Sequence, residues 1–294
     1  MLYDLYSKEK QNGNEFKSLQ FLEEYISTFI RSIPENQLTA EELEHLRRLT
    51  EKFIVKCNVV AMDYLTNQRN KNMSKACLDK AKNIIDLYGR IVFKEEEEKG
   101  TKLLVSTLSN FSVFYKECGN LEKALNALNL AQKAETHFNA SLELNFCAVL
   151  SQMNRHEEAL NHGLEALRQL ELFKKLNRIK HNIASCNETL IIAFYNVAVE
   201  YEHLKQTTSA MEYYSKENAS KLSARPSTLT SDSRGTHVRK VKPPSLVLPQ
   251  PTALKKPLAQ EALHPVTEVL IIFKSLYLKR GELRVPTCHS TRVQ

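Results

Sequence analysis

Three asparagines, Asn110, Asn145 and Asn196, are the side chains whose type and spacing most clearly suggest a chemistry. In each case the next two residues are one bulky and one small residue, so the three sites repeat a local pattern. A primary amide offers both a hydrogen-bond donor and an acceptor, and it can pair with a peptide bond without reading the adjacent side chain. A row of such amides would hold the backbone of an extended polypeptide, provided that the fold places them on one surface.

The residues that usually perform catalysis or bind metals form no recognisable set. The six cysteines include no CxxC pair and no histidine at metal-ligand spacing, so they predict reduced thiols. Phosphate-binding, zinc-protease and hydrolase motifs are absent, and seven glycines leave little material for a phosphate-cradling loop. We therefore expect a protein that is not an enzyme and needs no cofactor or metal. The histidines should be exposed or internally bonded, Cys118 and Cys147 structural, and Cys288 the most exposed thiol.

The chain of 294 residues changes character near residue 222. Its net charge is +7, yet twelve of its 41 Lys and Arg and only four of its 34 Asp and Glu lie in residues 223–294. Pro34 is the only proline before this segment, which holds the other eight. A long segment poor in proline and glycine can be continuous helix, whereas a proline-containing one cannot. We expect a helical body, then a basic flexible linker over residues 225–265 and a short apolar and basic segment over residues 266–294.

Apolar residues at three- and four-residue spacing predict helices throughout the body. One helix is expected over residues 16–30, after a turn at residues 12–14. The next helix begins with a capping box, in which Thr39 and Glu42 each bond the other's backbone amide. Glu95 to Glu98 are expected to form the solvated face of a helix.

One stretch has the residue pattern of two antiparallel helices joined by a tight turn. Small residues such as Ser112 and Ala124 would let the helix backbones approach, while Tyr115 and Leu128 fill the space beside them. A glycine would supply the turn. The full pattern is Leu108, Phe111, Ser112, Tyr115, Gly119, Leu121, Ala124, Leu128 and Ala131.

The pattern returns elsewhere in the body. Relative to Ala124, the equivalent small residues are Ala159, Ala210 and, in a weaker copy upstream, Ser74. Glu217 replaces the last small residue of the final copy. Two of the three intervals between copies are about 16 residues longer than the third, which corresponds to four or five turns of helix or to a helix plus a loop.

These copies resemble tetratricopeptide repeats over residues 55–224, with residues 1–54 as N-terminal capping helices. The resemblance implies an all-α fold in which helical hairpins stack into a right-handed solenoid, with a largely disordered C-terminal tail. The first helix of each hairpin would line a concave groove suited to an extended peptide or a partner helix. An irregular bundle of amphipathic helices is the alternative.

The spacing of the repeats assigns side chains to this groove. First helices of neighbouring repeats would lie about 8–10 Å apart and an extended strand advances about 3.3 Å per residue, so the asparagines would contact about every third residue of a ligand. They would supply generic affinity, and apolar side chains between them would confer specificity. The expected peptide-binding residues are Asn110, Val113, Lys116, Leu144, Asn145, Ala148, Tyr195, Asn196, Val199 and Glu202.

Residues 107–115 and 194–199 resemble the first helices of kinesin-light-chain-type repeats, in which an asparagine ladder binds cargo peptides. Repeats that bind the carboxylate of heat-shock chaperones require lysine where this chain has Ser109, Leu144 and Ile192, so a co-chaperone role is not expected. A purely structural alternative also remains, in which each asparagine bonds to a neighbouring helix.

The C-terminal segment suggests other partners. No aromatic residue lies between Tyr214 and Phe273, so there is no stacking platform for single-stranded nucleic acid, and DNA-specific binding is not expected. Beyond a plain linker, the basic residues could attract an acidic surface such as tubulin, anionic lipid or RNA. The apolar run in residues 266–278 is too short to span a membrane. It could cap the last repeat, occupy the groove or contact a membrane surface.

Together these observations predict a cytoplasmic interaction scaffold or adaptor that binds an extended peptide or partner helix in its groove. The chain has no run of 18 apolar residues and no signal-like N-terminal segment, which favours the cytoplasm. The alternative function is a cytoskeletal or membrane-associated structural component, in which the basic tail binds an acidic surface.

Overall fold

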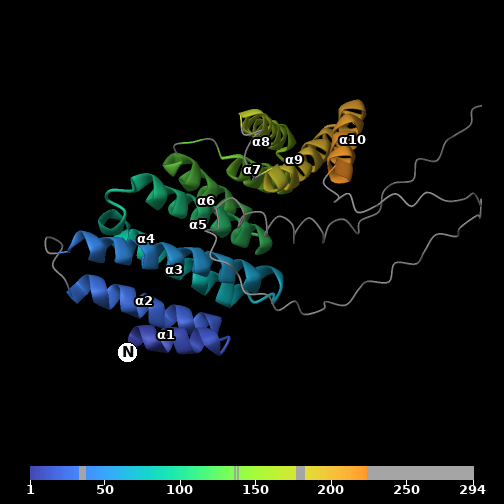
Figure 1. Ribbon diagram of the computed structural model, residues 1–294. Coiled ribbons are helices and arrows are strands. Elements are labelled where there is room, and N and C mark those ends of the chain that lie inside the picture. The colour runs from blue at the N-terminus through green and yellow to red at the C-terminus, as the bar shows by residue number, and fades with distance from the viewer. Residues whose placement is uncertain (33–37, 136, 138, 177–182, 224–294) are drawn as a thin grey trace, which may run out of the picture.

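The computed structural model describes residues 1–32, 38–135, 137, 139–176 and 183–223. These residues form ten α-helices and no strand. The helices run back and forth as stacked layers from α1 at one end to α10 at the other (Figure 1). The predicted all-α class of stacked helical hairpins is therefore confirmed. The expected linker and C-terminal segment, residues 225–294, lie outside the described residues.

The described helices form five consecutive pairs. Extensive contacts join the two helices of each pair, and the second helix of each pair from α4 onward also contacts the first helix of the next pair. Helix α1 was not predicted from the sequence. The bounds are α1 (Leu2–Gln11), α2 (Glu15–Ser32), α3 (Ala40–Thr66), α4 (Lys71–Val92), α5 (Glu97–Glu117), α6 (Leu121–Ala134), α7 (Ala140–Gln152), α8 (His156–Leu176), α9 (Ile183–His203) and α10 (Thr207–Ser223).

Side-chain caps determine where several of these helices begin. The predicted capping box is present at α3, where the Glu42 amide donates to Thr39 Oγ1 at 3.2 Å and the Thr39 amide donates to Glu42 Oε2 at 2.9 Å. Asn70, Asn120 and Asn139 cap α4, α6 and α7, each accepting a hydrogen bond from the amide three residues later. Each such cap satisfies a backbone donor that the helix itself leaves unpaired.

The last four helix pairs turn with the same backbone geometry. Arg69, Gly119, Asn154 and Lys205 adopt positive φ angles of 53°, 78°, 59° and 58°. Each lies five residues before a small residue that is buried in the following helix. The weak upstream copy is therefore a helical hairpin of the same kind as the other three. The buried small residues are Ser74, Ala124, Ala159 and Ala210.

The two long intervals between copies arise largely from longer helices. Helices α4 and α5 have 22 and 21 residues, whereas α6 and α7 have 14 and 13. Helices α8 and α9 again have 21 residues each, with residues 177–182 between them outside the described part of the chain. The extra residues therefore lie mainly in α4 and α5 and in α8 and α9, the helices on either side of two of the connections between pairs.

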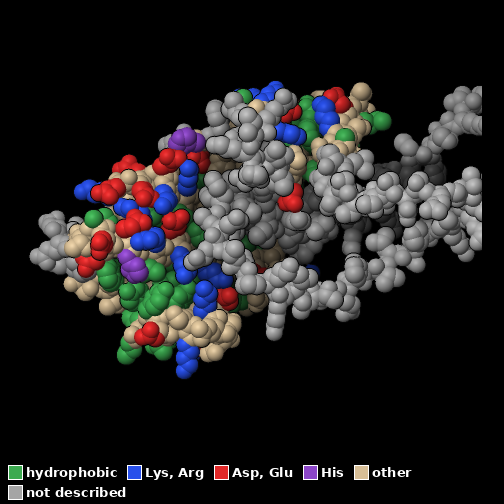
Figure 2. All heavy atoms as spheres, viewed as in Figure 1, with side chains coloured by type: hydrophobic (Ala, Val, Ile, Leu, Met, Phe, Trp, Pro, Cys, Tyr) green, Lys and Arg blue, Asp and Glu red, His purple; other side chains and the backbone are tan. Residues whose placement is uncertain are grey.

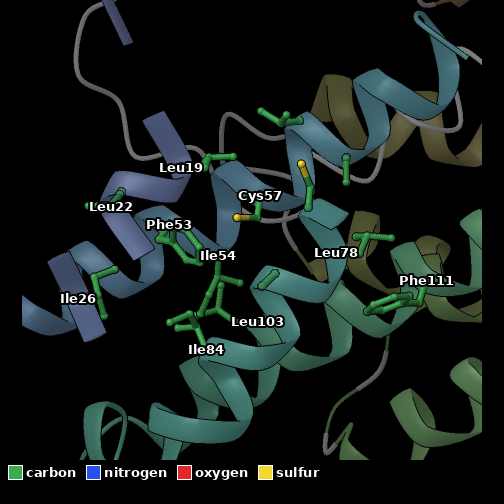
Figure 3. Packing of buried hydrophobic residues seen from close by; sticks show 14 of the residues in the cluster. Leu19, Leu22, Ile26, Phe53, Ile54, Cys57, Leu78, Ile84, Leu103 and Phe111 are labelled. Carbon is green, nitrogen blue, oxygen red and sulfur yellow. The ribbon is translucent and has the colours of Figure 1, made fainter. Parts of the chain in front are cut away.

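The N-terminal pair packs on α3. Figure 3 shows Phe53, Ile54 and Cys57 of α3 in a cluster that also includes Leu22 of α2 and Ile84 of α4, and all five side chains are buried. The boundary expected between residues 54 and 55 falls inside α3, so it does not separate two structural units. The hydrophobic core instead runs continuously from α1 and α2 into the first repeat-like pair.

Ion pairs hold the turn between α4 and α5, and they correct the prediction for Glu95 and Glu96, whereas Glu97 and Glu98 are exposed in the first turn of α5 as predicted. Buried Arg47 of α3 contacts Glu95 and Glu96 at 3.2 Å each and donates to the Val92 carbonyl at 3.2 Å. These two glutamates lie before α5 begins, so they are partners of a buried arginine and not a freely solvated helix face. On the face drawn in Figure 2, acidic and basic side chains are interspersed over the middle of the stack.

Two helix glycines provide a test of how closely the hairpins pack. A methyl group added at Gly163 of α8 would lie 2.8 Å from Val197 Cγ2 of α9, whereas one at Gly89 of α4 would meet its nearest neighbour at 3.7 Å. We expect Gly89→Ala to stabilise the protein by about 1 kcal/mol through helix propensity. Gly163→Ala should instead destabilise it by about 1 kcal/mol, because overpacking outweighs that gain. Urea denaturation followed by circular dichroism measures both, and equal stabilisation by the two changes would contradict the close approach of α8 and α9.

Candidate functional site

The first helices of the last four pairs lie next to one another. Helix α3 contacts α5, α5 contacts α7, and α7 contacts α9. Asn110, Asn145 and Asn196 lie on α5, α7 and α9 at the same distance from their turn residues, Gly119, Asn154 and Lys205. Because equivalent positions on adjacent, equivalent helices face the same way, the fold arranges the three asparagines as neighbouring positions of one row.

Within the described residues, the three amides make no internal hydrogen bond. Asn110 and Asn145 are each only 4% exposed, and Asn196 is half-buried. Among the described residues, no side-chain hydrogen bond joins any of the three to another group, and none of their polar atoms is sealed from solvent. Because these atoms reach solvent, water can bond to them in the free protein, and they remain available to an external partner.

Hydroxyl groups beside the asparagines are also uncommitted. Ser106 and Ser109 of α5 and Ser141 of α7 make no side-chain hydrogen bond within the described part of the chain. Serines elsewhere in the helices, such as Ser18 and Ser112, donate to a backbone carbonyl of the preceding turn. The row therefore offers several neutral donors and acceptors.

Two of the predicted specificity residues are part of the core. Val113 is 5% exposed and belongs to the cluster formed by α1 to α6, while Leu144 is 0% exposed and packs with residues of α8 and α9. Their positions fall in the seams where neighbouring helices pack, and burial there removes their apolar surface from water. The prediction that they contact a ligand was therefore wrong.

Two other predicted residues contact the last helix. The Tyr195 ring packs edge-on against Tyr214 of α10 at 6.1 Å, and the Tyr214 hydroxyl donates to Glu202 Oε2 at 2.8 Å. Burial, followed by the hydrogen bond to Glu202, raises the pKa of Tyr214 above its ordinary value. Tyr195 and Glu202 thus take part in the packing of α9 on α10.

The remaining predicted residues differ in how accessible they are. The Lys116 side chain is largely buried, with its ammonium 3.4 Å from Glu117. Ala148 and Val199 are half-buried and lie in the row with the asparagines. Asn196 is likewise half-buried, whereas Asn110 and Asn145 are as deeply buried as Val113 and expose only a small polar surface.

A cleft that the sequence did not predict lies beyond the α3 end of this row. It has a volume of about 660 Å³ and lies between the α1–α2 turn and α3. Its α3 wall includes Val59, Val60 and Asp63, which occupy the positions equivalent to Ser109, Asn110 and Val113. Counting back from the turn residue Arg69 would have placed these side chains on the groove, but the upstream copy of the repeat has no asparagine there.

The histidines and cysteines support no catalytic or metal site in the described residues. His156 Nδ1 lies 2.8 Å from Glu200 Oε2 and its ring stacks on His203, while His162 pairs with Glu143 at 2.6 Å. The prediction that His156 and His162 are internally bonded is confirmed. No group of three potential metal ligands occurs in this part of the chain.

The three cysteines singled out from the sequence differ in where they lie. Cys147 is buried as expected, whereas Cys118 is exposed and Cys288 lies outside the described residues. Burial raises the pKa of the Cys77 thiol to about 12, and it also raises the pKa values of Cys57 and Cys147. These three thiols are therefore protonated at neutral pH and are poor nucleophiles.

No protein-family model matches the sequence, and no curated protein is significantly similar to it. In the described residues, no helix is both long and apolar enough to cross a membrane. The case for the groove therefore depends on the geometry of the helices and on the uncommitted polar groups.

Stability measurements can test whether the side chains of Asn110 and Asn145 lack internal hydrogen bonds. Asn110→Ala and Asn145→Ala should each change the free energy of unfolding by less than about 0.5 kcal/mol, because they break no internal hydrogen bond and remove an unpaired amide. Asn120→Ala in the same α5–α6 hairpin removes a helix cap and should cost about 1 kcal/mol. Urea titration of the three variants measures these changes in the free energy of unfolding. A loss at Asn110 or Asn145 equal to that at Asn120 would support the structural alternative.

Proposed function

We propose that the protein is a non-enzymatic interaction scaffold of the tetratricopeptide-repeat type, which binds an extended polypeptide along the inner face of α5, α7 and α9. The observation that carries the proposal is the pair of nearly buried amides, Asn110 and Asn145, without internal hydrogen-bond partners. The repeat assignment is supported by the common turn geometry and by the buried small residue five positions after each turn.

Binding would use the polypeptide backbone. Each asparagine accepts a hydrogen bond from a ligand N–H through its carbonyl oxygen and donates one to a ligand C=O through its amino group. At a helix spacing of about 8–10 Å and a strand rise of about 3.3 Å per residue, successive asparagines engage every third ligand residue. Each such bond contributes only about 0.5–1.5 kcal/mol, so these contacts orient the ligand without selecting its sequence.

A neutral groove also limits which ligands fit. Asn110, Asn145, Ala148, Asn196 and Val199 carry no charge, so binding does not depend on long-range attraction between ions. Ala148 and Val199 leave room for ligand side chains of moderate size beside the amides. We therefore favour an uncharged extended segment as the ligand over an acidic or basic one.

The test compares affinity capture from cytosol by the full chain and by a variant carrying Asn110→Ala, Asn145→Ala and Asn196→Ala. A matched control replaces three exposed asparagines of the outer helices, Asn126, Asn129 and Asn161, with alanine. We expect at least one protein to be captured by the wild type and the control at both low and high salt, and to be lost from the groove variant.

Two results would contradict the proposal. Identical sets of captured proteins for the groove variant and the wild type would remove the asparagine row as a binding site. Capture that disappears at high salt for all three proteins would favour the alternative, in which the basic residues after position 222 bind an acidic surface.

A further inference from the structure

The cleft lies against α3, at the position that continues the asparagine row of α5, α7 and α9. Val60 of α3 is equivalent in position to Asn110 of α5, and these two helices contact each other. The opposite wall is formed by the α1–α2 turn and the first turn of α2, including Asn14 and Phe16. A ligand that follows the row from α7 to α5 and continues in the same direction would enter this cleft.

The two lysines that line the cleft are paired with carboxylates. Lys56 contacts Glu15 at 3.1 Å, and Lys17 contacts Glu9 at 3.2 Å. The Asp63 carboxylate accepts hydrogen bonds from the side-chain amides of Asn67 and Gln68, both at 2.7 Å. An acidic ligand would have to displace one of the carboxylates bound to Lys17 and Lys56, so the cleft offers it no unpaired ammonium group.

About half of the surface that lines the cleft is apolar. Phe16, Val59, Val60 and Tyr64 line it, and Val59 is 38% exposed. Removing such surface from water favours an apolar occupant. The volume of about 660 Å³ lies within the range of pockets that bind compact ligands, so it can admit a bulky side chain together with adjacent backbone.

We infer that this cleft binds one aromatic or long aliphatic side chain of the extended polypeptide, and that it determines the sequence preference that the asparagine row lacks. The inference rests on the proposed function, because the asparagines must direct the polypeptide toward α3. With helices about 8–10 Å apart, the apolar residue stands about three positions from the residue held by Asn110 and about six from the residue held by Asn145.

The probe is a displayed library of random 12-residue peptides, selected against the full chain. Enriched peptides should share one bulky apolar residue with no required charge. Binding of a labelled enriched peptide is then measured by fluorescence polarisation. We expect Val59→Lys to weaken it at least tenfold. Leu87→Lys, a change at a 54% exposed leucine of α4 outside the cleft, should leave it unchanged.

A double-mutant comparison connects the peptide residue to the cleft. Replacing the shared apolar residue of the peptide with alanine should weaken binding to the wild type about tenfold and to Val59→Lys by less than twofold. Equal losses on both proteins would show that this residue binds elsewhere, which would overturn the inference. Enrichment of a charged residue in place of an apolar one would overturn it as well.

A further variant separates failure of the cleft from failure of the groove. If the double variant Asn110→Ala and Asn145→Ala weakens peptide binding but Val59→Lys does not, the asparagine row is supported as a binding site and the inference about the cleft is wrong. If Val59→Lys weakens binding and the double alanine variant does not, the cleft binds peptides and the asparagine row does not. If no peptide is enriched, or if neither variant changes binding, both proposals fail.

Discussion

The structure depends on one packing constraint, the close contact of two helix backbones at a small buried residue that follows a left-handed turn by five positions. Ser74, Ala124, Ala159 and Ala210 occupy this position in the last four pairs. Because a larger side chain there would separate the helices, the constraint fixes how each first helix is rotated relative to its partner. That rotation decides which side chains of each first helix enter the core and which lie on its other faces. The alignment of Asn110 with Asn145 follows from it.

The same packing buries two of the asparagine side chains without giving them an internal hydrogen bond among the described residues. In a loose bundle they would be solvated, and at a typical core position each amide would bond to its surroundings. Here Asn110 and Asn145 are nearly buried without an internal partner. Because their polar atoms reach solvent, water can bond to them in the free protein, and a ligand would have to replace that water. Their occurrence on adjacent first helices, next to the uncommitted hydroxyl of Ser109, is easier to reconcile with a ligand than with a structural role.

Patterns among residues close in sequence predicted many of the helices and turns of this fold. The features that they did not predict depend on contacts between helices far apart in the sequence. The capping box at Thr39 and the small residues at the hairpin crossings depend on neighbours within a few positions, so the sequence reveals them. The burial of Leu144 depends on α8 and α9, and the engagement of Tyr195 depends on α10. Two of the ion-pair partners of Arg47, Glu95 and Glu96, lie more than forty residues away. Repeat spacing places a residue on a helix face but does not reveal which neighbouring helix covers that face.

Under the proposed function, the upstream repeat would add a second kind of recognition to the asparagine row. Where the other repeats have asparagine, α3 has Val60, and the α1–α2 turn approaches it to form a cleft. Amides recognise the backbone that every polypeptide shares, whereas an apolar cleft discriminates among side chains. Apolar burial is not directional, so the cleft alone would tolerate many orientations of a ligand. Hydrogen bonds are directional, so the amides can set the orientation and position at which a side chain reaches the cleft. The two features are therefore complementary, and the spacing between α3 and α5 determines where in a ligand the selected residue must stand.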